Sequence, residues 1–576
     1  MIMATKAVVS SGHYLASQAG MAMFQMGGNA MDAAAAAGFA LHVLMPQQNG
    51  LAGEAPMLVH SARQGKTWAL SGNGTAPRGA TIEAFRSLGI GLIPGDGLLP
   101  AIVPPAVGSW ILLLREFGRL RLWQVLGPAI GLSADGFAMY DSLAAQLAGL
   151  AERFRRDWPS SFEAYLPDSR LPEIGDLWRQ KDLAGTLRSL SKADRSFRRR
   201  PDGLRAAHDA FYQGAIARRI DRFCRAAAPD GTGRSHRGFL TAEDMAAFEP
   251  RLEDPAARSY KGYRLFKCGP WTQGPALLQA LGLLEGFDLQ AMGHNSADYV
   301  HTVVECIKLA YADREFHYGD PGFVRVPLGR LLSPEYCRNR RRLVDSRKAS
   351  LELRPGGHRK MTATDIMDLN VRFGRAARPA QGDTTAVQTA DSDGNIVSAV
   401  PSGGWMMSSP VVGGLGFPLG TRGQMFSLAE GHPNSLRPGK RPRTTLTPTL
   451  AARLRRPPHL AFASPGGDCQ DQWNLQFFLN VVEFGMSLQQ AVEAPTFNSK
   501  HFPDSFYPRA AKPGVLHVEG RLPKRVRDEL AQRGHDVRLQ GPWSGGNCMA
   551  VSIDHRTGLL SAAASPRYDP AYAAGC

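Results

Sequence analysis

The chain has 576 residues, of which 43% are hydrophobic, 20% charged and 8% aromatic. These proportions are typical of globular proteins and exclude a disordered chain, a collagen-like chain and a long coiled coil. The net charge of +16 favours an anionic partner, such as nucleic acid, a membrane surface or a carboxylate substrate. Because the densest basic runs, 198–200 and 338–342, have no interleaved aromatic residues, we interpret them as solvated surface and expect no nucleic-acid partner.

Cysteine usage and the apolar runs bear on the cellular compartment. The seven cysteines are widely spaced without a Cys-x-x-Cys pair, which predicts neither a disulfide framework nor a zinc site and indicates a reducing compartment. Residues 1–6 lack the basic and apolar regions of a secretory signal. The longest apolar runs, such as 33–45, are shorter than the ~20 residues of a membrane-spanning helix. The sequence therefore predicts a cytoplasmic protein with no membrane partner.

The first 150 residues are predicted to be mainly helical. Two helices over 16–45 are separated by the Gly-Gly-Asn segment 27–29, and the second helix is so rich in alanine that it should pack closely. Two short strands are expected over 56–69. Further helices are predicted over 109–117 and 122–151.

The middle of the chain begins with a polar, arginine-rich stretch, 152–235, which we predict to be mostly helical and peripheral. A strand follows at 260–266. Helices are predicted over 276–284 and 297–311, and the second of these has apolar residues at helical spacing.

Residues 346–382 mix Gly, Arg, Lys and Pro with little periodicity, which predicts an exposed linker. Directly after it, 384–400 is typical of a β-hairpin around an Asp-Gly-Asn turn. The remaining residues are rich in predicted strands, with helices over 473–484 and 523–532. A flexible segment thus leads directly into a hairpin that begins Thr384-Thr385.

Thr384 at the start of this hairpin suggests a specific chemistry. If the chain is cut between Asp383 and Thr384, Thr384 becomes an N-terminal residue. Its α-amino group, with a pKa of about 8 in peptides, then lies within reach of its own hydroxyl and can act as general base without a histidine. The alternative is structural, because two threonines at the start of a strand fit ordinary strand propensity.

Several motifs resemble, in the same order, those of the γ-glutamyltranspeptidase family. The processing site of the family is matched by Gly382-Asp383-Thr384-Thr385 and the turn that follows. The other matching segments are 17–20, 27–33, 262–263, 271–274, 308–314, 438–449 and 464–467. The resemblance covers residues 10–130 and 255–570 and leaves 150–250 as the least matched part.

The family consists of N-terminal-nucleophile hydrolases that cleave their own precursor and have a four-layer αββα fold. The resemblance therefore implies an α+β protein with a single αββα sandwich. Cleavage between Asp383 and Thr384 would give a large subunit, 1–383, ending in the flexible linker 346–383, and a small subunit, 384–576. The subunits are expected to stay associated, since strands from both would share the core.

The resemblance also implies roles for individual residues. Thr384 matches the nucleophile for chain cleavage and for substrate attack, and Thr385 matches the family's second threonine. Ser402 stands where the family has a hydroxyl residue hydrogen-bonded to the amino group of the nucleophile. Gly466 and Gly467 match the pair whose backbone N–H groups form the oxyanion hole, and glycine lets such donors come close to a tetrahedral intermediate. Their structural alternative is a tight turn.

Departures from the family pattern concern the substrate. Thr444 and Thr445 stand where a serine pair contacts the substrate's α-carboxylate, although a strand edge is the structural alternative. Asn73 stands where an arginine grips that carboxylate, and an amide cannot replace a bidentate guanidinium. Met425 stands where an aspartate holds the α-ammonium, and methionine offers no anion. A true glutathione hydrolase is therefore not expected.

Two further family residues, an asparagine and a histidine, are replaced by Gly404 and Ala386. The chain instead has Arg422 at a new position and a bulky Trp-Met-Met segment, 405–407. We hypothesise that Arg422, together with Arg443, pairs with a carboxylate on a substrate that lacks the γ-glutamyl amino group. The alternative is a structural loop arginine.

The sequence thus predicts a self-processing amidohydrolase or acyltransferase that acts on a small acidic acyl substrate through Thr384. One alternative is a C–C bond hydrolase that removes an oxalyl-type group in antibiotic or other natural-product biosynthesis. Another is a non-catalytic binding protein on the same fold. No metal site is predicted, because no His, Cys or carboxylate cluster has ligand spacing, and no organic cofactor is implied. Assembly into a homo-oligomer is left open.

Overall fold

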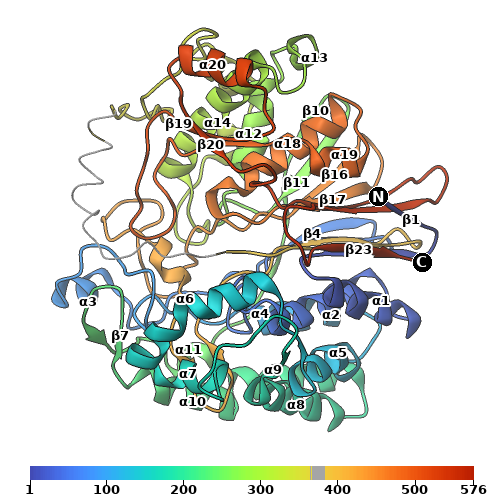
Figure 1. Cartoon of the computed structure of the whole chain (residues 1–576), viewed down its shortest axis with the longest axis vertical. Coiled ribbons are helices and arrows are strands. Elements are labelled where there is room, and N and C mark those ends of the chain that lie inside the picture. Colours follow the sequence, from blue (N-terminus) through green and yellow to red (C-terminus); the bar gives the residue numbers. More distant parts are fainter. Residues whose placement is uncertain (363–364, 366–382) are drawn as a thin grey trace.

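Two antiparallel β-sheets stack face to face at the centre of the molecule (Figure 1). The computed structural model describes residues 1–362, 365 and 383–576. The upper sheet has seven strands in the order β1 (Ile2–Ala4), β22 (Leu560–Ala564), β21 (Met549–Ile553), β17 (Pro458–Ala463), β16 (Thr449–Arg453), β11 (Tyr263–Lys267) and β10 (Ala256–Tyr260). The lower sheet has seven in the order β23 (Tyr572–Gly575), β2 (Ala7–Ser11), β12 (Val387–Asp391), β13 (Ile396–Ala399), β3 (Met57–Ser61), β4 (Lys66–Leu70) and β9 (Leu252–Glu253).

Strands from distant parts of the chain alternate within each sheet. The hairpin β12–β13 is inserted between β2 and β3, with Val387 opposite Ser11 and Val397 opposite Val59. In the upper sheet, β11 pairs with β16. Every residue of β12 and β13 is buried, because the other sheet covers one face and helices cover the other. The start of this hairpin is therefore held in the middle of the sandwich.

The lower helical layer packs on the lower sheet. Helices α1 (Tyr14–Gln25) and α2 (Ala30–Leu44) contact it directly, and α4 (Ala106–Phe117) packs on α2. All residues of α2 are buried, and its alanines permit this close approach, as predicted. Gly38 is required there, because a Cβ at that position would lie 2.2 Å from the Trp110 ring.

The upper helical layer completes the sandwich. Helices α12 (Pro275–Leu284) and α18 (Gln470–Val482) contact the upper sheet, and α14 (Ala297–His317) packs on α12 (Figure 1). These elements share one apolar core that includes Leu281, Val304 and Phe478. The predicted four-layer αββα architecture is confirmed. None of the helices in the described ranges is long and apolar enough to cross a lipid bilayer.

The arginine-rich stretch extends the lower helical layer. It contains α6 (Asp141–Asp157), α7 (Pro159–Tyr165), α8 (Lys181–Arg195), α9 (Arg200–Tyr212) and α10 (Ala215–Cys224). The single helix predicted over 122–151 is wrong, because α5 (Leu122–Ala134) and α6 are separated by the short strand β5 (Phe137–Ala138). Gly136 explains the break, since its φ of +97° is incompatible with a continuing helix.

The first part of the predicted linker is packed against the protein. Leu353 is buried and forms a backbone bridge with Met361, and Arg354 pairs with Glu305 of α14 at 3.3 Å. Apolar residues and a buried partner for Arg354 therefore attach residues 349–361, which the composition alone suggested to be free. Within the predicted linker 346–383, residues 363–364 and 366–382 lie outside the described part of the chain.

Candidate active site

Thr384 lies just before β12, where the backbone already pairs with the chain that follows β13. It forms an antiparallel bridge with Ser402, and the Thr385 N–H donates to the Pro401 carbonyl at 3.1 Å. The Thr384 Oγ1 and Ser402 Oγ atoms are 3.0 Å apart, and both residues are buried. The hairpin predicted from the sequence therefore brings these two hydroxyl groups into direct contact.

Asp383 precedes Thr384 and has several hydrogen-bond partners. Its carbonyl oxygen accepts hydrogen bonds from Ser402 Oγ at 2.9 Å and from the Trp405 indole Nε1 at 2.6 Å. Its carboxyl accepts from the Thr384 N–H at 2.8 Å and from Gln48 Nε2 at 3.0 Å. Desolvation raises the pKa of this carboxyl to about 6, and the hydrogen bonds from the Thr384 N–H and Gln48 oppose that shift.

Arg422 supports Ser402 from the side opposite Asp383. Its Nη2 donates to Ser402 Oγ at 2.9 Å, and Nε and Nη2 donate to one carboxylate oxygen of Glu54 at 3.0 and 2.8 Å. Both side chains of this ion pair are fully buried. Burial raises the pKa of Glu54, while the Arg422 charge opposes that shift. The carboxylate that faces Arg422 in this structure thus belongs to the chain itself, and Nη1 has no partner among the described residues.

Gly466 and Gly467 connect β17 to α18 with backbone conformations that suit glycine. Their φ angles are +122° and +55°, and a Cβ on Gly466 would lie 2.2 Å from the Trp473 ring. Gln470, at the start of α18, points Nε2 toward Thr384 Oγ1 at 3.5 Å. The predicted glycine pair therefore lies on the segment that approaches Thr384.

The predicted carboxylate-binding threonines have different surroundings. Thr444 is held by backbone hydrogen bonds, with its N–H donating to Trp271 and its carbonyl accepting from Gln273. The Thr445 hydroxyl is buried without a partner among the described residues. Arg443 is buried beside Glu315 at 3.2 Å, and desolvation lowers the pKa of its guanidinium to about 10. Nη1 of Arg443 is likewise buried without a partner among the described residues.

Asn73 has a structural contact that the sequence did not predict. Its Nδ2 donates to the Pro442 carbonyl at 2.6 Å, which ties its loop to the segment before Thr444. Asn73 also lines a cavity of about 490 Å³ together with Arg251, Asp320 and Arg441, and Thr384 is not among the residues that line it. No contact in the described residues joins Asn73 to Thr384.

Three residues near Thr384 and Asp383 were not predicted as site residues from the sequence: Glu54, Gln470 and Trp405. Trp405 was noticed only for its size, yet its indole N–H reaches the Asp383 carbonyl. Glu54 had a usable signal, because it is the one acidic residue in the otherwise uncharged loop 46–56. A buried carboxylate requires a cationic partner.

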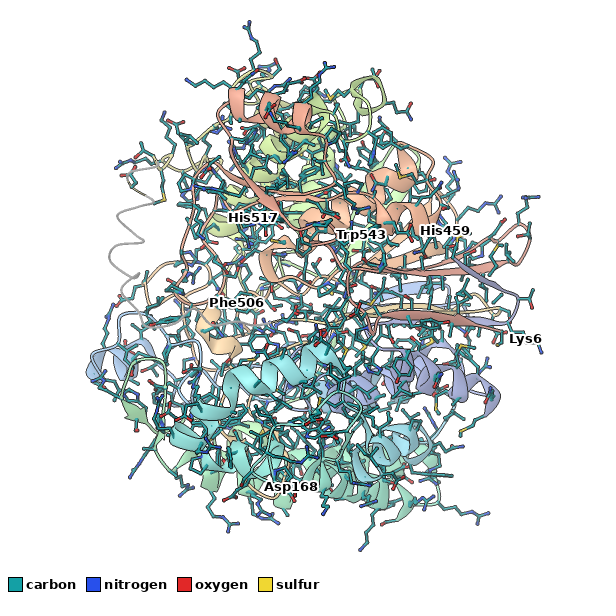
Figure 2. All side chains as sticks on the ribbon, viewed as in Figure 1. Lys6, Asp168, His459, Phe506, His517 and Trp543 are labelled. Atoms are coloured by element: carbon teal, nitrogen blue, oxygen red, sulfur yellow. The ribbon has the colours of Figure 1, made fainter. Side chains whose placement is uncertain are left out.

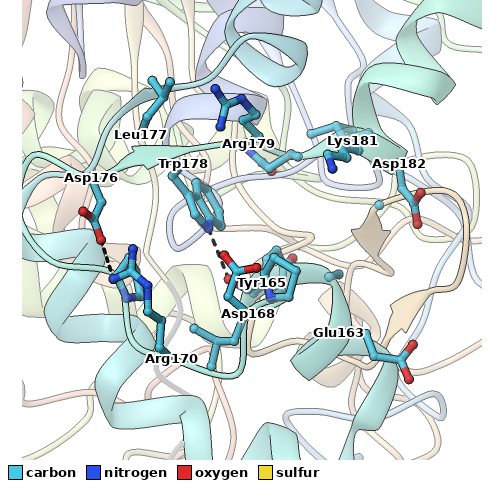
Figure 3. A pocket seen from close by; sticks show the side chains of 17 residues that line it. Glu163, Tyr165, Asp168, Arg170, Asp176, Leu177, Trp178, Arg179, Lys181 and Asp182 are labelled. Carbon is cyan, nitrogen blue, oxygen red and sulfur yellow. Dashed lines mark hydrogen bonds and ion pairs between the residues drawn. The ribbon is translucent and has the colours of Figure 1, made fainter.

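A second cavity lies in the least matched region, between α7 and β6 (Leu177–Trp178), and measures about 350 Å³ (Figure 3). Its walls carry mixed charges, including an Arg170–Asp176 ion pair of 2.8 Å. The Trp178 indole is tied to the Tyr165 carbonyl. None of the site residues predicted from the sequence lines this cavity.

Within the described residues, one group has the composition of a metal site: His301, Glu305 and His535. The two histidines are already hydrogen-bonded, with His301 Nδ1 2.9 Å from His535 Nε2. Glu305 is already paired with Lys308 at 2.6 Å and with Arg354. A divalent cation would meet these two positive charges, so we interpret the group as a buried polar network.

The αββα sandwich places a threonine at the start of a central strand, with a hydroxyl partner and a glycine turn nearby. This combination is typical of an N-terminal-nucleophile hydrolase. The sequence model described as Gamma-glutamyltranspeptidase matches residues 16–575, and the chain belongs to this family. It is therefore an enzyme of the hydrolase and acyltransferase type.

Individual relatives span the whole chain. The "Glutathione hydrolase-like YwrD proenzyme" of Bacillus subtilis (strain 168) is 30% identical over 99% of this chain and 98% of its own length. The "Oxamate amidohydrolase proenzyme" of Klebsiella pneumoniae is 31% identical, with 97% of each chain covered. A solved structure described as "Structure of LmbA2991HD" has a TM-score of 0.92 and 44% identity, covering 100% of this chain and 99% of the other.

Proposed function

We propose that the chain is a self-processing amidohydrolase or acyltransferase in which Thr384 is the nucleophile. The observation that carries this proposal is the 3.0 Å contact between Thr384 Oγ1 and Ser402 Oγ, next to the peptide bond that joins Asp383 to Thr384. Proenzymes among the relatives support cutting of the precursor into residues 1–383 and 384–576. The freed amino group of Thr384 then serves as general base for its own hydroxyl.

In the mature enzyme, Thr384 Oγ1 attacks the carbonyl carbon of the substrate while the α-amino group takes its proton. The N–H groups of Gly466 and Gly467 stabilise the oxyanion. The amino group returns the proton to the leaving amine, and water or an acceptor amine resolves the acyl-enzyme. Ser402 holds the amino group in place through its hydroxyl.

The substrate we propose is a small acidic acyl amide. Arg422 and Arg443 each keep one buried Nη1 without a partner among the described residues, and Thr445 keeps a free hydroxyl. These donors suit a carboxylate. Asn73 and Met425 stand where the family holds a γ-glutamyl carboxylate and ammonium, which disfavours glutathione. The relative named oxamate amidohydrolase acts on an amide of this acidic type, as its name states.

The test begins with the intact masses of the wild-type protein and of Thr384→Ala. We expect two fragments from wild type, the smaller starting at Thr384, and one uncut chain from the variant. The mature protein is then assayed with oxamate-like amides, with γ-glutamyl p-nitroanilide and with oxalyl ketones. Ammonia release from the first group supports the proposal, whereas oxalate release from a ketone would assign C–C cleavage instead. A wild-type chain that stays uncut would contradict the nucleophile and favour a binding protein.

The role of Arg422 is tested separately by Arg422→Ala in protein that has completed its slower self-cleavage. We expect KM for an acidic substrate to rise because a binding contact is lost, and kcat to fall as well because Arg422 also donates to Ser402. An unchanged KM would reject Arg422 as the carboxylate partner.

A further inference from the structure

The carbonyl oxygen of Asp383 lies between two hydrogen-bond donors from the chain that follows β13. Ser402 Oγ donates to it at 2.9 Å and Trp405 Nε1 donates to it at 2.6 Å. We propose that the precursor cleaves itself through an oxyanion site of its own, formed by the Ser402 hydroxyl and the Trp405 indole and separate from the Gly466–Gly467 turn. This inference rests on the proposed function, because it takes the bond from 383 to 384 as the one that is cut.

The directions of the hydrogen bonds around Ser402 follow from its single proton. Arg422 Nη2 donates to Ser402 Oγ, and Ser402 Oγ donates to the Asp383 carbonyl. The Thr384 hydroxyl is therefore the donor in its 3.0 Å contact with Ser402. This arrangement provides a path for a proton from the Thr384 hydroxyl, through Ser402, to the Asp383 carbonyl oxygen. That oxygen gains negative charge as the new bond forms, and the proton then neutralises it.

The cleavage is then an N-to-O acyl shift in which every proton has a path. Thr384 Oγ1 bonds to the Asp383 carbonyl carbon while its proton passes to Ser402, and the Ser402 proton passes to the carbonyl oxygen. When the resulting five-membered ring opens, the C–N bond breaks and the oxygen's proton moves to the Thr384 nitrogen. Water hydrolyses the remaining ester to the Asp383 carboxylate and the Thr384 hydroxyl.

Trp405 is fixed in this position by its neighbours. Its indole N–H also donates to the Gln48 carbonyl at 2.9 Å, and the Arg422 guanidinium lies 5.0 Å from its ring centre. The Phe506 ring centre is 6.0 Å away, and Phe506 lies between the two helical layers on the side away from the chain termini (Figure 2). The donor is therefore preorganised, as oxyanion stabilisation requires.

Two glycines allow the chain turn that places Trp405 beside the Asp383–Thr384 peptide bond. Gly403 and Gly404 have φ angles of +74° and +61°, a left-handed pair that reverses the chain after Ser402. A Cβ on Gly404 would lie 2.9 Å from the Gly53 backbone nitrogen. The glycine that replaces the family asparagine thus makes room for the turn that delivers the indole.

The experiment follows conversion of newly synthesised full-length chain into its two fragments in a cell-free translation reaction, by gel and intact mass. Trp405→Phe keeps an aromatic ring and removes the N–H, and we expect cleavage to slow by about 100-fold. Trp68→Phe is the matched control, since Trp68 lies on β4 and its indole N–H donates to Gln64, and this variant should cleave at the wild-type rate. If Trp405→Phe misfolds, benzothienylalanine at position 405 replaces the N–H by sulfur within the same shape.

Hydroxylamine shows whether the variant is blocked before or after the ester forms, because it cleaves esters and leaves amides intact. We expect no rescue of Trp405→Phe by hydroxylamine, since the block precedes the ester. Rescue would overturn the proposal by placing the defect after the acyl shift. Wild-type cleavage with an equally fast Trp405→Phe would also overturn it and leave the proposed function standing. A wild-type chain that is never cut would reject both.

Discussion

Two buried carboxylates with cationic partners, Glu54 near the proposed nucleophile and Glu305 in α14, differ in how many of their oxygens have a partner. Glu305 binds Lys308 through one oxygen and Arg354 through the other. Glu54 binds Arg422 through a single oxygen, and its second oxygen has no partner among the described residues. Arg422 also donates a hydrogen bond to Ser402. The Glu305 network is closed within the fold, whereas the Glu54 network extends through Arg422 to the Ser402 hydroxyl beside Thr384.

Neutralising each carboxylate gives the largest expected effects. Glu54→Gln and Glu305→Gln should both lower the free energy of unfolding by about 3–5 kcal/mol, because each leaves a buried cation unpaired. Only Glu54→Gln should also slow self-cleavage, by about 100-fold, since Arg422 would no longer hold Ser402. Urea unfolding in the Thr384→Ala background gives the stability, and a fragment time course gives the rate.

The double variant Glu54→Gln with Arg422→Met serves as the control, because it removes both charges. It should recover much of the stability and none of the cleavage rate. Equal slowing by Glu54→Gln and Glu305→Gln would contradict the distinction between the two networks.

Removing the hydroxyl that receives the Arg422 bond has the next largest effect. Ser402→Ala should slow self-cleavage by about 100-fold, the usual cost of one oxyanion donor. Ser402→Thr keeps the hydroxyl and should retain much of the rate. The cleavage rate is measured by the appearance of the small fragment. If Ser402→Ala cleaves at the wild-type rate, Ser402 has no part in the mechanism.

Replacing Asn73 should have a smaller effect, confined to the free energy of unfolding. Asn73→Ala loses the hydrogen bond to the Pro442 carbonyl and should cost about 1 kcal/mol of unfolding free energy. Self-cleavage should be unchanged, because no described contact joins Asn73 to Thr384. Thermal unfolding measures the first effect, and a slower fragment time course would show that the loop reaches the site.

The smallest expected effect is a pH dependence of precursor stability that comes from Asp383. Folding raises the pKa of this carboxyl from 3.8 to about 6, and Tyr568 is a titratable group that interacts with it. The protonated form therefore contributes stability below about pH 4, and this contribution is lost as pH rises through 6. In the Thr384→Ala background, Asp383→Asn should flatten the melting temperature between pH 4 and 7, and an unchanged profile would contradict the assignment.

The sequence could predict what short segments encode. The hairpin after Thr384 and the alanine-rich α2 follow from local sequence patterns, whereas the four layers follow only from the motifs that resemble a family. The Glu54–Arg422 pair could not be predicted, because its members are 368 residues apart and only the sheet register brings them together. The contact of Trp405 with Asp383 was equally hidden, since it depends on two left-handed glycines.

Composition misled in two places for physical reasons. Gly136 was taken as part of one long helix, although its positive φ ends α5 and starts a new element. Residues 349–361 were taken as free because they are polar, yet Leu353 is buried and Arg354 finds a buried anion. In both cases one residue with a specific backbone angle or partner outweighs the average of its segment.

The alternation of strands has a consequence for assembly. Because β12 and β13 are ladder neighbours of β2 and β3, and β11 is a neighbour of β16, a cut after Asp383 would separate two chains that still share both sheets. Neither product contains a complete sheet. The mature enzyme would be a heterodimer whose halves never had to meet by diffusion, since they were folded while still joined. Once denatured, such a pair would face a bimolecular search that the precursor avoided.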